Sequence, residues 1–568
     1  MLTMTECYYC WFLVCLACIF LFDSITSAEL HRYTFVIEET PVTRLCETRN
    51  IITVNGHLPG PTLYVHNGDT LIIEVYNKAK YNATMHWHGV RQIRTAWADG
   101  PAYITQCPIR SGGSFTYQFS IIEQEGTLWW HAHISWLRAT VHGALVIYPM
   151  EGNWYPFPEP HAEVPIVLGE WWNNDPITVE YKANLTGAAP NISDAFTING
   201  QPGDLYPCSS SETFQLYVQQ GKTYLLRIVN AAVNSHLFFK IAAHNLTVVA
   251  VDATYTKPYT TEVVFIAPGQ STDILLTANQ WAGKYYMAAR KYTTQAEGYF
   301  DNTTTTAILS YDDFQWYANP ILPNLPLYND TETVTTFSRA LRSLVSPDYP
   351  VEVPQCIDER LFITVGLGLL PCPTGSTCGG PNNTRITASM NNVSFVLPDI
   401  SILQSYYFGI NDVFSTDFPS NPPLVFNYTG DVPKSLWAPV SGTKVKVLNY
   451  NDAVEVVFQG TNIFQSDNHP MHVHGYHFYV VGEGFGNYNA QTDPLTFNLI
   501  DPPQRNTVGV PVNGWVAIRF KANNPGVWFV HCHFDDHFTW GLNMVFLVKN
   551  GANRLESLDP PPPDLLKC

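Results

Sequence analysis

An internal repeat between the two ends of the 568-residue chain constrains the fold more than any other feature. The segment GTLWWHAHISWL (126–137) lines up with GVWFVHCHFDDH (526–537), and two histidines fall at matching places in both. HWHG (86–89) and HVHG (472–475) recur between the same two thirds of the chain. Repeats that recur in this way predict homologous units rather than one continuous architecture.

The middle third carries the same frame without the paired histidines. Ala288 of KYYMAA falls where His131 stands in the first third. Phe239 and Ile241 of SHLFFKI fall where HPMHVHG has its last two histidines. The sequence therefore predicts three homologous domains, of which only the outer two kept the histidines. Their expected limits are 29–150, 151–325 and, with a linker at its start, 326–568.

Short runs of β-branched residues predict that these domains are built of strands. TLIIEVYN (70–77), TYLLRIVN (223–230) and AVEVVFQG (453–460) are typical examples, each bounded by turn-forming residues. The 41 prolines and 36 glycines punctuate the whole chain. No sustained helical period is present, so we expect an all-β protein of sandwiches or barrels.

The first 28 residues have the features of a secretory signal. An apolar run from Trp11 to Phe22 is too short to span a bilayer, and small residues precede Glu29. The absence of Lys and Arg before this run departs from the usual signal pattern. No later segment approaches the length of a membrane span. The formal net charge of −18 argues against a nucleic-acid partner.

Cysteines and glycosylation acceptor sites also suit an exported protein. Eight cysteines follow the leader, and most should pair in an oxidising compartment. Cys372 and Cys378, close together in a Pro/Gly-rich loop, are the easiest local bridge to propose. If Cys532 has a chemical role, seven cysteines remain and one must stay free. Nine Asn-x-Ser/Thr sites occur, at Asn82, Asn184, Asn191, Asn245, Asn302, Asn329, Asn382, Asn392 and Asn427.

His531, Cys532 and His533 form the segment that carries the most chemistry. Side chains alternate between the two faces of a strand, so both imidazoles point one way, roughly 6.5–7 Å apart along it, and the thiol points the other way. One strand can then serve two metal centres, joined covalently by a short path for electrons. The copy in the first third has Ala132 in place of the cysteine.

The cysteine of this segment predicts a copper site of the blue type, in which one cysteine and two histidines bind the ion and the axial ligand is weak or absent. His537, five residues after Cys532, is one candidate ligand, and His469, just before Pro470, is the other. The axial ligand would come from near Leu542, and leucine cannot coordinate a metal. A missing axial sulfur should raise the reduction potential of the copper.

Paired histidines predict a second centre. Four His-x-His pairs exceed the needs of one ion and suit a three-copper cluster between the first and third domains. The pairs are His86/His88, His131/His133, His472/His474 and His531/His533.

Other histidines and two acidic residues near the pairs have alternative interpretations. The remaining histidines are expected to be structural: His31, His57, His66, His142, His161, His236, His244 and His477. Asp99 follows the first pair in WADGP, and Asp535 follows Cys532 by three residues. Each could relay protons to bound oxygen, or could fix the orientation of a histidine from outside the metal shell.

These motifs resemble the multicopper oxidases and, within them, the plant laccases, over nearly the whole chain after the leader. The similarity is carried by HWHGVRQIRTAWADGPAYITQCPI, GTLWWHAHISWLRATVHGA, HPMHVHGYHFYVVGEG, DPPQRNTVGVP and HCHFDDHFTWGL. It implies three tandem cupredoxin-like domains, each a Greek-key β-sandwich or barrel, and four copper ions. The implied ligands are His469, Cys532 and His537 for type 1 copper, His86 and His472 for type 2, and His88, His131, His133, His474, His531 and His533 for the type 3 pair.

The resemblance also implies an activity. Phenols, including lignin precursors, would give up single electrons at the type 1 copper, and the cluster would reduce dioxygen to two waters. The enzyme is expected to be a secreted monomer of the apoplast or cell wall. Family disulfides suggest Cys46–Cys208 and Cys107–Cys568 besides Cys372–Cys378, which leaves Cys356 as the odd thiol.

Three alternative functions share parts of this pattern. Ascorbate oxidases have methionine at the axial position, where this chain has Leu542, and Met544 lies two residues too late. A ferroxidase would need carboxylates beside the type 1 histidines, and Asp467 and Asp536 keep that function open. A non-enzymatic copper-binding wall protein would not need all ten histidines and the cysteine.

Overall fold

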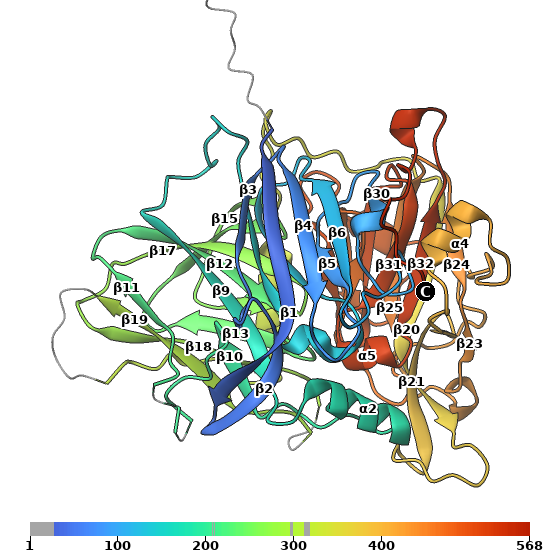
Figure 1. Cartoon of the computed structure of the whole chain (residues 1–568), viewed down its shortest axis with the longest axis horizontal. Coiled ribbons are helices and arrows are strands. Elements are labelled where there is room, and N and C mark those ends of the chain that lie inside the picture. Colours follow the sequence, from blue (N-terminus) through green and yellow to red (C-terminus); the bar gives the residue numbers. More distant parts are fainter. Residues whose placement is uncertain (1–27, 207, 210, 296–298, 312–318) are drawn as a thin grey trace, which may run out of the picture.

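The computed structural model describes residues 28–568 except 207, 210, 296–298 and 312–318. The leader expected at residues 1–28 therefore lies outside the described residues, apart from Ala28. Strands dominate the described chain, and they form three pairs of sheets that follow one another in sequence, coloured blue, green and orange to red (Figure 1). This architecture confirms the predicted all-β fold class.

The first pair consists of two four-stranded sheets, with the strand orders β2-β1-β4-β6 and β3-β8-β7-β5. Their apolar faces enclose one hydrophobic core. The strands are β1 (Leu30–Arg44), β2 (Glu47–Val54), β3 (Leu63–His66), β4 (Thr70–Asn77), β5 (Met85–His88), β6 (Ser114–Ser120), β7 (Gly126–Ala132) and β8 (His142–Tyr148).

The second pair has a six-stranded sheet, ordered β10-β9-β12-β17-β14-β15, and a five-stranded sheet, ordered β11-β19-β18-β13-β16. It encloses a core of its own. The strands are β9 (Ala162–Trp171), β10 (Ala195–Ile198), β11 (Gln215–Val218), β12 (Thr223–Asn230), β13 (His236–Ile241), β14 (Leu246–Val251), β15 (Thr254–Thr261), β16 (Val264–Ile266), β17 (Ser271–Thr277), β18 (Lys284–Tyr292) and β19 (Thr304–Tyr311).

The third pair has an eight-stranded sheet, ordered β23-β22-β21-β20-β25-β30-β27-β28, and a five-stranded sheet, ordered β24-β32-β31-β26-β29. The strands are β20 (Glu359–Pro371), β21 (Thr384–Met390), β22 (Val393–Phe395), β23 (Val440–Gly442), β24 (Val445–Leu448), β25 (Ala453–Gly460), β26 (His469–Val473), β27 (Phe478–Phe485), β28 (Gln504–Arg505), β29 (Thr507–Val510), β30 (Gly514–Lys521), β31 (Gly526–Cys532) and β32 (Asn543–Val548).

Helices are short and lie between the strands. The α-helices are α2 (Pro176–Thr186), α3 (Thr331–Ala340), α4 (Ile402–Phe408) and α5 (Asp535–Thr539). The 3-10 helices are η1 (Ala96–Ala98), η2 (Ser135–Ala139), η3 (Lys434–Leu436), η4 (Asp493–Thr496) and η5 (Arg554–Glu556). Within the described part of the chain, none of the helices has the length and apolar character that crossing a membrane requires.

The three runs that predict strands from their β-branched residues are strands in the structure. They are β4, β12 and β25, with the same limits as the runs. Each lies inside a sheet with a neighbour on both sides. β12 and β25 are buried on both faces, whereas β4 exposes Tyr76 on one face.

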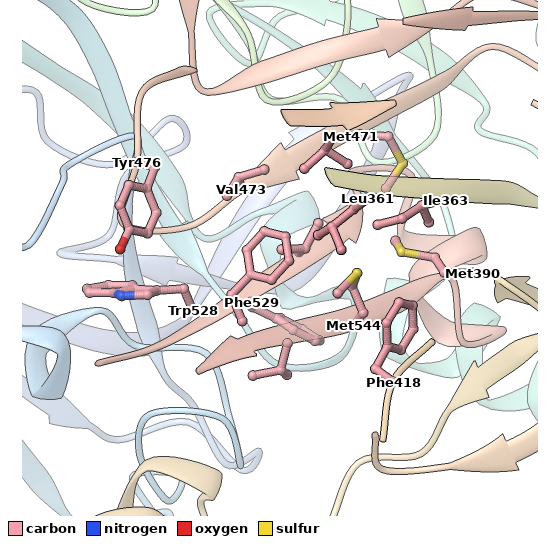
Figure 2. Close-up of a cluster of buried hydrophobic side chains, with 14 of the residues drawn as sticks. Leu361, Ile363, Met390, Phe418, Met471, Val473, Tyr476, Trp528, Phe529 and Met544 are labelled. Atoms are coloured by element: carbon pink, nitrogen blue, oxygen red, sulfur yellow. The ribbon is translucent and has the colours of Figure 1, made fainter. Parts of the chain in front are cut away.

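The core of the third pair holds the strand that carries Cys532. Figure 2 shows Leu361 and Ile363 of one sheet facing Met471 and Met544 of the other. All four side chains are buried, and each contributes about 1.5–3 kcal/mol to folding by leaving water. This packing fixes β26 and β31 side by side.

Buried polar contacts and disulfides hold the three pairs of sheets against one another. Thr127 of the first donates to the buried carboxylate of Asp273 in the second. Arg505 of the third lies 3.0 Å from Asp252 of the second, and both are buried. The disulfide Cys46–Cys208 joins the first pair to the second, and Cys107–Cys568 joins the first to the C-terminal segment. The histidine-bearing strands are thereby fixed in space.

Candidate metal centres

Strand register brings the histidine pairs together. In the first domain, β5 runs antiparallel to β7 and places His86 opposite His131. In the third domain, β26 runs antiparallel to β31 and places His472 opposite His531. Rings from the two domains then mix, since the ring centroids of His88 and His472 are 3.9 Å apart. One group of eight buried imidazoles therefore lies between the first and third domains.

The eight imidazoles fall into three sets, each of which could hold one metal ion. The ligand atoms within each set lie within 4.8 Å of one another. The sets are His86/His88/His472, His88/His131/His533 and His133/His474/His531. In the third set, Nε2 of His531 lies 3.1 Å from Nε2 of His474 and 3.4 Å from that of His133. Three nitrogens bound to one ion at about 2.0–2.1 Å are separated by about this distance.

In three of the rings, a hydrogen bond at Nδ1 leaves Nε2 free to bind a metal. Nδ1 of His86 donates to the carbonyl of Asp99 (2.7 Å), and Nδ1 of His472 donates to that of Asn506 (2.9 Å). His131 donates through Nδ1 in the same way, to the carbonyl of Ala132 (2.8 Å). Nε2 of all three rings is buried without a hydrogen-bond partner. Buried nitrogens of this kind are costly unless they bind an ion, so these residues fit a metal cluster.

Cys532 forms a separate group with the two predicted histidines. Its Sγ lies 3.5 Å from Nδ1 of His537 and 3.9 Å from Nδ1 of His469, and the two Nδ1 atoms are 3.1 Å apart. One thiol and two converging imidazoles suit copper. The backbone N–H of Cys532 donates to the carbonyl of Leu542 (3.1 Å), which places this leucine beside the cysteine. The leucine side chain is fully buried.

Burial sets the protonation of these groups in the protein without metal. It lowers the pKa of the imidazoles, and in the cluster the neighbouring rings lower it further; the residues are His88, His131, His133, His469, His472, His474, His531, His533 and His537. The rings are therefore neutral, which is the form that binds metals. Burial raises the pKa of the Cys532 thiol, and a bound cation would remove its proton.

Asp99 lies directly against the cluster. Its Oδ2 is 2.9 Å from Nδ1 of His474, its Oδ1 is 3.4 Å from Nδ1 of His86, and its side chain is fully buried. Gly100 makes this approach possible, because a Cβ at that residue would lie 1.8 Å from the carbonyl oxygen of Met85. Asp99 therefore contacts two of the candidate ligands, from both domains.

Asp535 contacts an arginine rather than a histidine. Its carboxylate lies 3.3 Å from Arg138, whose Nη2 donates to the carbonyls of His533 and Val233 (2.9 Å each). Asp535 also borders a small cavity with His133 and others of the cluster. Burial raises the pKa of its carboxyl group to about 7. Asp535 thus shares the wall of a small cavity with three of the cluster histidines.

Several residues in contact with the site were missed by sequence reasoning. Thr507 and Asn506, within the segment DPPQRNTVGVP, lie 3.1 Å from Nε2 of His88. His236, expected to be structural, comes from the second domain and donates to the carbonyl of Asn468 (2.8 Å), next to His469. The repeat carried this signal, since SHLFFKI aligns His236 with His469.

A cavity of about 690 Å³ opens beside the site formed by Cys532, His469 and His537, between the second and third domains. Its lining includes His537, Asp467, Phe464 and Trp540 from the third domain and His236 from the second. Cavities of about 300–1,000 Å³ suit small organic molecules. His537 is the candidate metal ligand exposed to this space, and Asp467 places a buried carboxyl group in the same wall.

The remaining cysteines are placed as follows. The structure holds the disulfides Cys46–Cys208, Cys107–Cys568 and Cys372–Cys378. Two free cysteines are found in the described chain, Cys356, which is exposed, and Cys532, which is buried.

Comparison with known proteins connects this geometry to a family. Sequence models of the multicopper oxidases match residues 36–152, 162–313 and 417–552. Laccase-12 of Arabidopsis thaliana is 59% identical over 550 residues, covering 96% of this chain and 97% of that protein. Laccase-3 of Oryza sativa subsp. japonica is 57% identical over 551 residues, covering 96% of each.

Solved structures agree with the architecture. The laccase from Botrytis aclada superposes with a TM-score of 0.70 at 27% identity, covering 94% of this chain and 89% of that one. Fet3p, a multicopper oxidase that functions in iron import, superposes with a TM-score of 0.71, covering 91% and 90%. At 22% identity, this second likeness concerns the fold alone.

Proposed function

This chain belongs to the multicopper oxidase family and is a laccase, and we propose that it oxidises phenols at Cys532 and its two histidines while reducing dioxygen at the eight-histidine cluster. Four bound copper ions would supply the redox chemistry, in which four phenols each lose one electron and one proton at the first site and dioxygen takes up four electrons and four protons at the second, giving two waters. Asp467 and Asp536, the carboxylates that a ferroxidase would need, both line the cavity beside His537, and the high identity to plant laccases is what favours phenols over iron as the substrate.

The proposed ligand assignment follows the sets of converging atoms. We assign His469, Cys532 and His537 to the type 1 ion, and His86 and His472 to the type 2 ion. The two type 3 ions fall to the sets His88/His131/His533 and His133/His474/His531. We also assign the domain limits 29–150, 151–325 and 326–568, within which the three pairs of sheets lie.

One observation carries the proposal: β31 presents side chains to two centres. Sγ of Cys532 faces His469 and His537, whereas the two adjacent histidines belong to the cluster. The two sites are therefore joined by consecutive residues of one strand. A metal-storage protein has no need of such a connection, and an oxidase that separates its two half-reactions requires one.

Residues around the cluster orient the ligands and supply protons. Asp99 accepts from Nδ1 of His86 through its backbone carbonyl and from Nδ1 of His474 through its carboxylate, which fixes the tautomer that leaves Nε2 toward the metal. Asp535 borders the small cavity that reaches His133, and we assign it the delivery of protons toward bound oxygen. Arg138 fixes this carboxylate beside the cluster.

The cavity beside His537 is the proposed phenol site. Phe464 and Trp540 provide apolar walls for an aromatic ring. The carboxyl group of Asp467 lies in the same wall, next to the chain of His469, and is placed to accept the proton that a phenol loses on oxidation. Apolar walls together with a nearby proton acceptor suit plant phenols such as monolignols.

We further propose that the protein is exported to the apoplast or cell wall and acts there as a monomer on phenols of the lignin pathway. Three disulfides suit an oxidising compartment. All nine Asn-x-Ser/Thr asparagines are at least partly exposed, so the acceptor sites are accessible. Size-exclusion chromatography with light scattering tests the oligomeric state.

Oxygen uptake by the purified, copper-loaded glycoprotein tests the activity. A methoxyphenol, ascorbate and ferrous ion are compared in parallel at equal concentration. We expect rapid uptake with the phenol, without peroxide. Uptake with ascorbate or iron and none with the phenol would retain the copper sites and overturn the substrate. Metal analysis of the same sample separates a missing activity from missing copper.

A further inference from the structure

Three glycosylation acceptor sites border the substrate cavity. Asn191 itself lies in the cavity lining, and Asn302 and Asn382 directly follow the lining residues Asp301 and Pro381. Asn191 and Asn302 come from the second domain, and Asn382 comes from the third. All three asparagines are exposed. The sites therefore border the cavity from the two domains that enclose it.

The chain at Asn191 is fixed although its side chain is exposed. Its carbonyl accepts from Nε1 of Trp172 (3.0 Å), and Asp194 accepts from the backbone N–H of Asn173 (2.7 Å). Ser193, the third residue of the acceptor site, is buried and donates to Asp301 (3.1 Å). A glycan on Asn191 would be attached at a defined point of the cavity wall.

The chain at Asn382 is also fixed, in a tight turn. Gly380 donates to the carbonyl of Thr384 (3.0 Å), and Cys378 donates to the side chain of Asn383 (2.8 Å). The same hairpin is tied to the C-terminal end of α2, since Gly379 donates to the carbonyl of Thr186 (2.9 Å). The hairpin of the third domain and the loop that leads to Asn191 therefore lie against each other.

Exposed apolar side chains surround this opening. Ile192 is 49% exposed and Tyr299 is 75% exposed, and both line the cavity. An uncovered apolar rim would attract aromatic polymers as readily as small phenols. N-linked glycans are bulky and hydrophilic, and they would cover such a rim.

We propose that N-linked glycans on Asn191, Asn302 and Asn382 form a collar around the cavity that admits monomeric phenols and hinders phenols attached to oligomers or polymers. This collar rests on the proposed export of the protein and on phenol oxidation beside His537. It acts on access alone, because none of the three asparagines belongs to a candidate metal group. It therefore alters which phenols reach the site and leaves the electron transfer steps unchanged.

The test compares one phenol in two sizes. Glycopeptide mass spectrometry first measures the occupancy of all nine sites in the secreted protein. The kcat/KM is then measured for a free methoxyphenol and for the same methoxyphenol linked to soluble polyethylene glycol. The rim variant carries Asn191→Gln, Asn302→Gln and Asn382→Gln. The control variant carries Asn82→Gln, Asn245→Gln and Asn427→Gln, which also removes three sites but none that borders the cavity.

We expect the rim variant to raise kcat/KM for the linked phenol about tenfold and to change that for the free phenol by less than about twofold, the split that a change in access produces. The control variant should keep the native ratio of kcat/KM for the linked phenol to kcat/KM for the free phenol. Enzymatic removal of glycans from the folded native protein should reproduce the rim result, which guards against misfolding of the variant. Unoccupied rim sites, or an unchanged ratio, would overturn the collar. If the native protein failed to oxidise the free phenol, the proposed function would fail instead.

Discussion

The strand β7 with helix η2 in the first domain and the strand β31 with helix α5 in the third are two copies of one frame. The backbone N–H of Ala132 donates to the carbonyl of Val141 (2.9 Å), just as that of Cys532 donates to that of Leu542 (3.1 Å). In both copies the two flanking histidines point into the shared cluster. The copies differ on the opposite face of the strand.

On that face the third domain has polar ligands and the first domain has an apolar core. The residues His469, Cys532 and His537 correspond to Ala83, Ala132 and Leu137 in the repeat. All six are buried, and the three in the first domain belong to its hydrophobic core. The same backbone arrangement therefore accommodates either metal ligands or apolar side chains on this face. The type 1 site depends on three side chains rather than on a different fold.

The largest effect is expected from Cys532→Ser, which makes the third domain resemble the first on this face. We expect loss of the blue colour and of phenol oxidation to background, since serine cannot replace the thiolate. A buried hydroxyl without a partner costs about 1–3 kcal/mol of stability, so the fold should survive. Absorption spectra, oxygen uptake and circular dichroism check this. Cys356→Ser, at the exposed free thiol, is the matched control and should change none of the three. Retained turnover in Cys532→Ser would refute the assignment of this site.

Asp99→Asn tests the shared face of the two copies. The carboxylate touches His86 and His474 and none of the type 1 residues, so the blue colour should remain. We expect cluster copper binding or oxygen reduction to fall about 10–100-fold, the usual cost of losing a partner that orients metal ligands. Copper analysis and oxygen uptake measure the effect. Asp412→Asn, at an exposed residue, is the control. Full activity in Asp99→Asn would show that the histidines are oriented without it.

Leu542→Met should have the smallest effect, on the potential alone. A thioether beside the copper should lower the type 1 reduction potential, and a tenfold change in a one-electron equilibrium corresponds to about 59 mV. The swap nearly conserves volume and should cost less than about 1.5 kcal/mol. Redox titration of the blue band measures the shift. Val141→Met, at the corresponding residue of the first domain, should leave the potential unchanged. An unchanged potential in Leu542→Met would show that this side chain does not face the copper.

Much of the fold was accessible from local sequence. The runs 70–77, 223–230 and 453–460 are strands in full, because β-branched residues between turn formers favour one local conformation. The His-Cys-His segment also predicted the separation of two centres, because strand side chains alternate faces whatever lies around them.

The surroundings of the site were less accessible. Arg138, Asn506 and Thr507 contact cluster histidines that are hundreds of positions away in the chain, and neither periodicity nor motif spacing encodes such contacts. His236 was assigned a structural role, although its alignment with His469 in the repeat pointed to the same corner of the fold. Only the docking of the second domain on the third brought it to the cavity wall.

By itself, the sequence determined that the chain forms three homologous β-domains and which residue types could bind copper, because strand propensity and side-chain alternation are local properties. Tertiary structure decided which imidazoles share an ion: His88 and His131 of the first domain join His533 of the third. It also decided that Asp99 reaches histidines of both domains. The physical reason is that these sets form only when the first and third domains dock, and docking depends on core packing and buried contacts such as Gln124 with His477, which no single segment specifies.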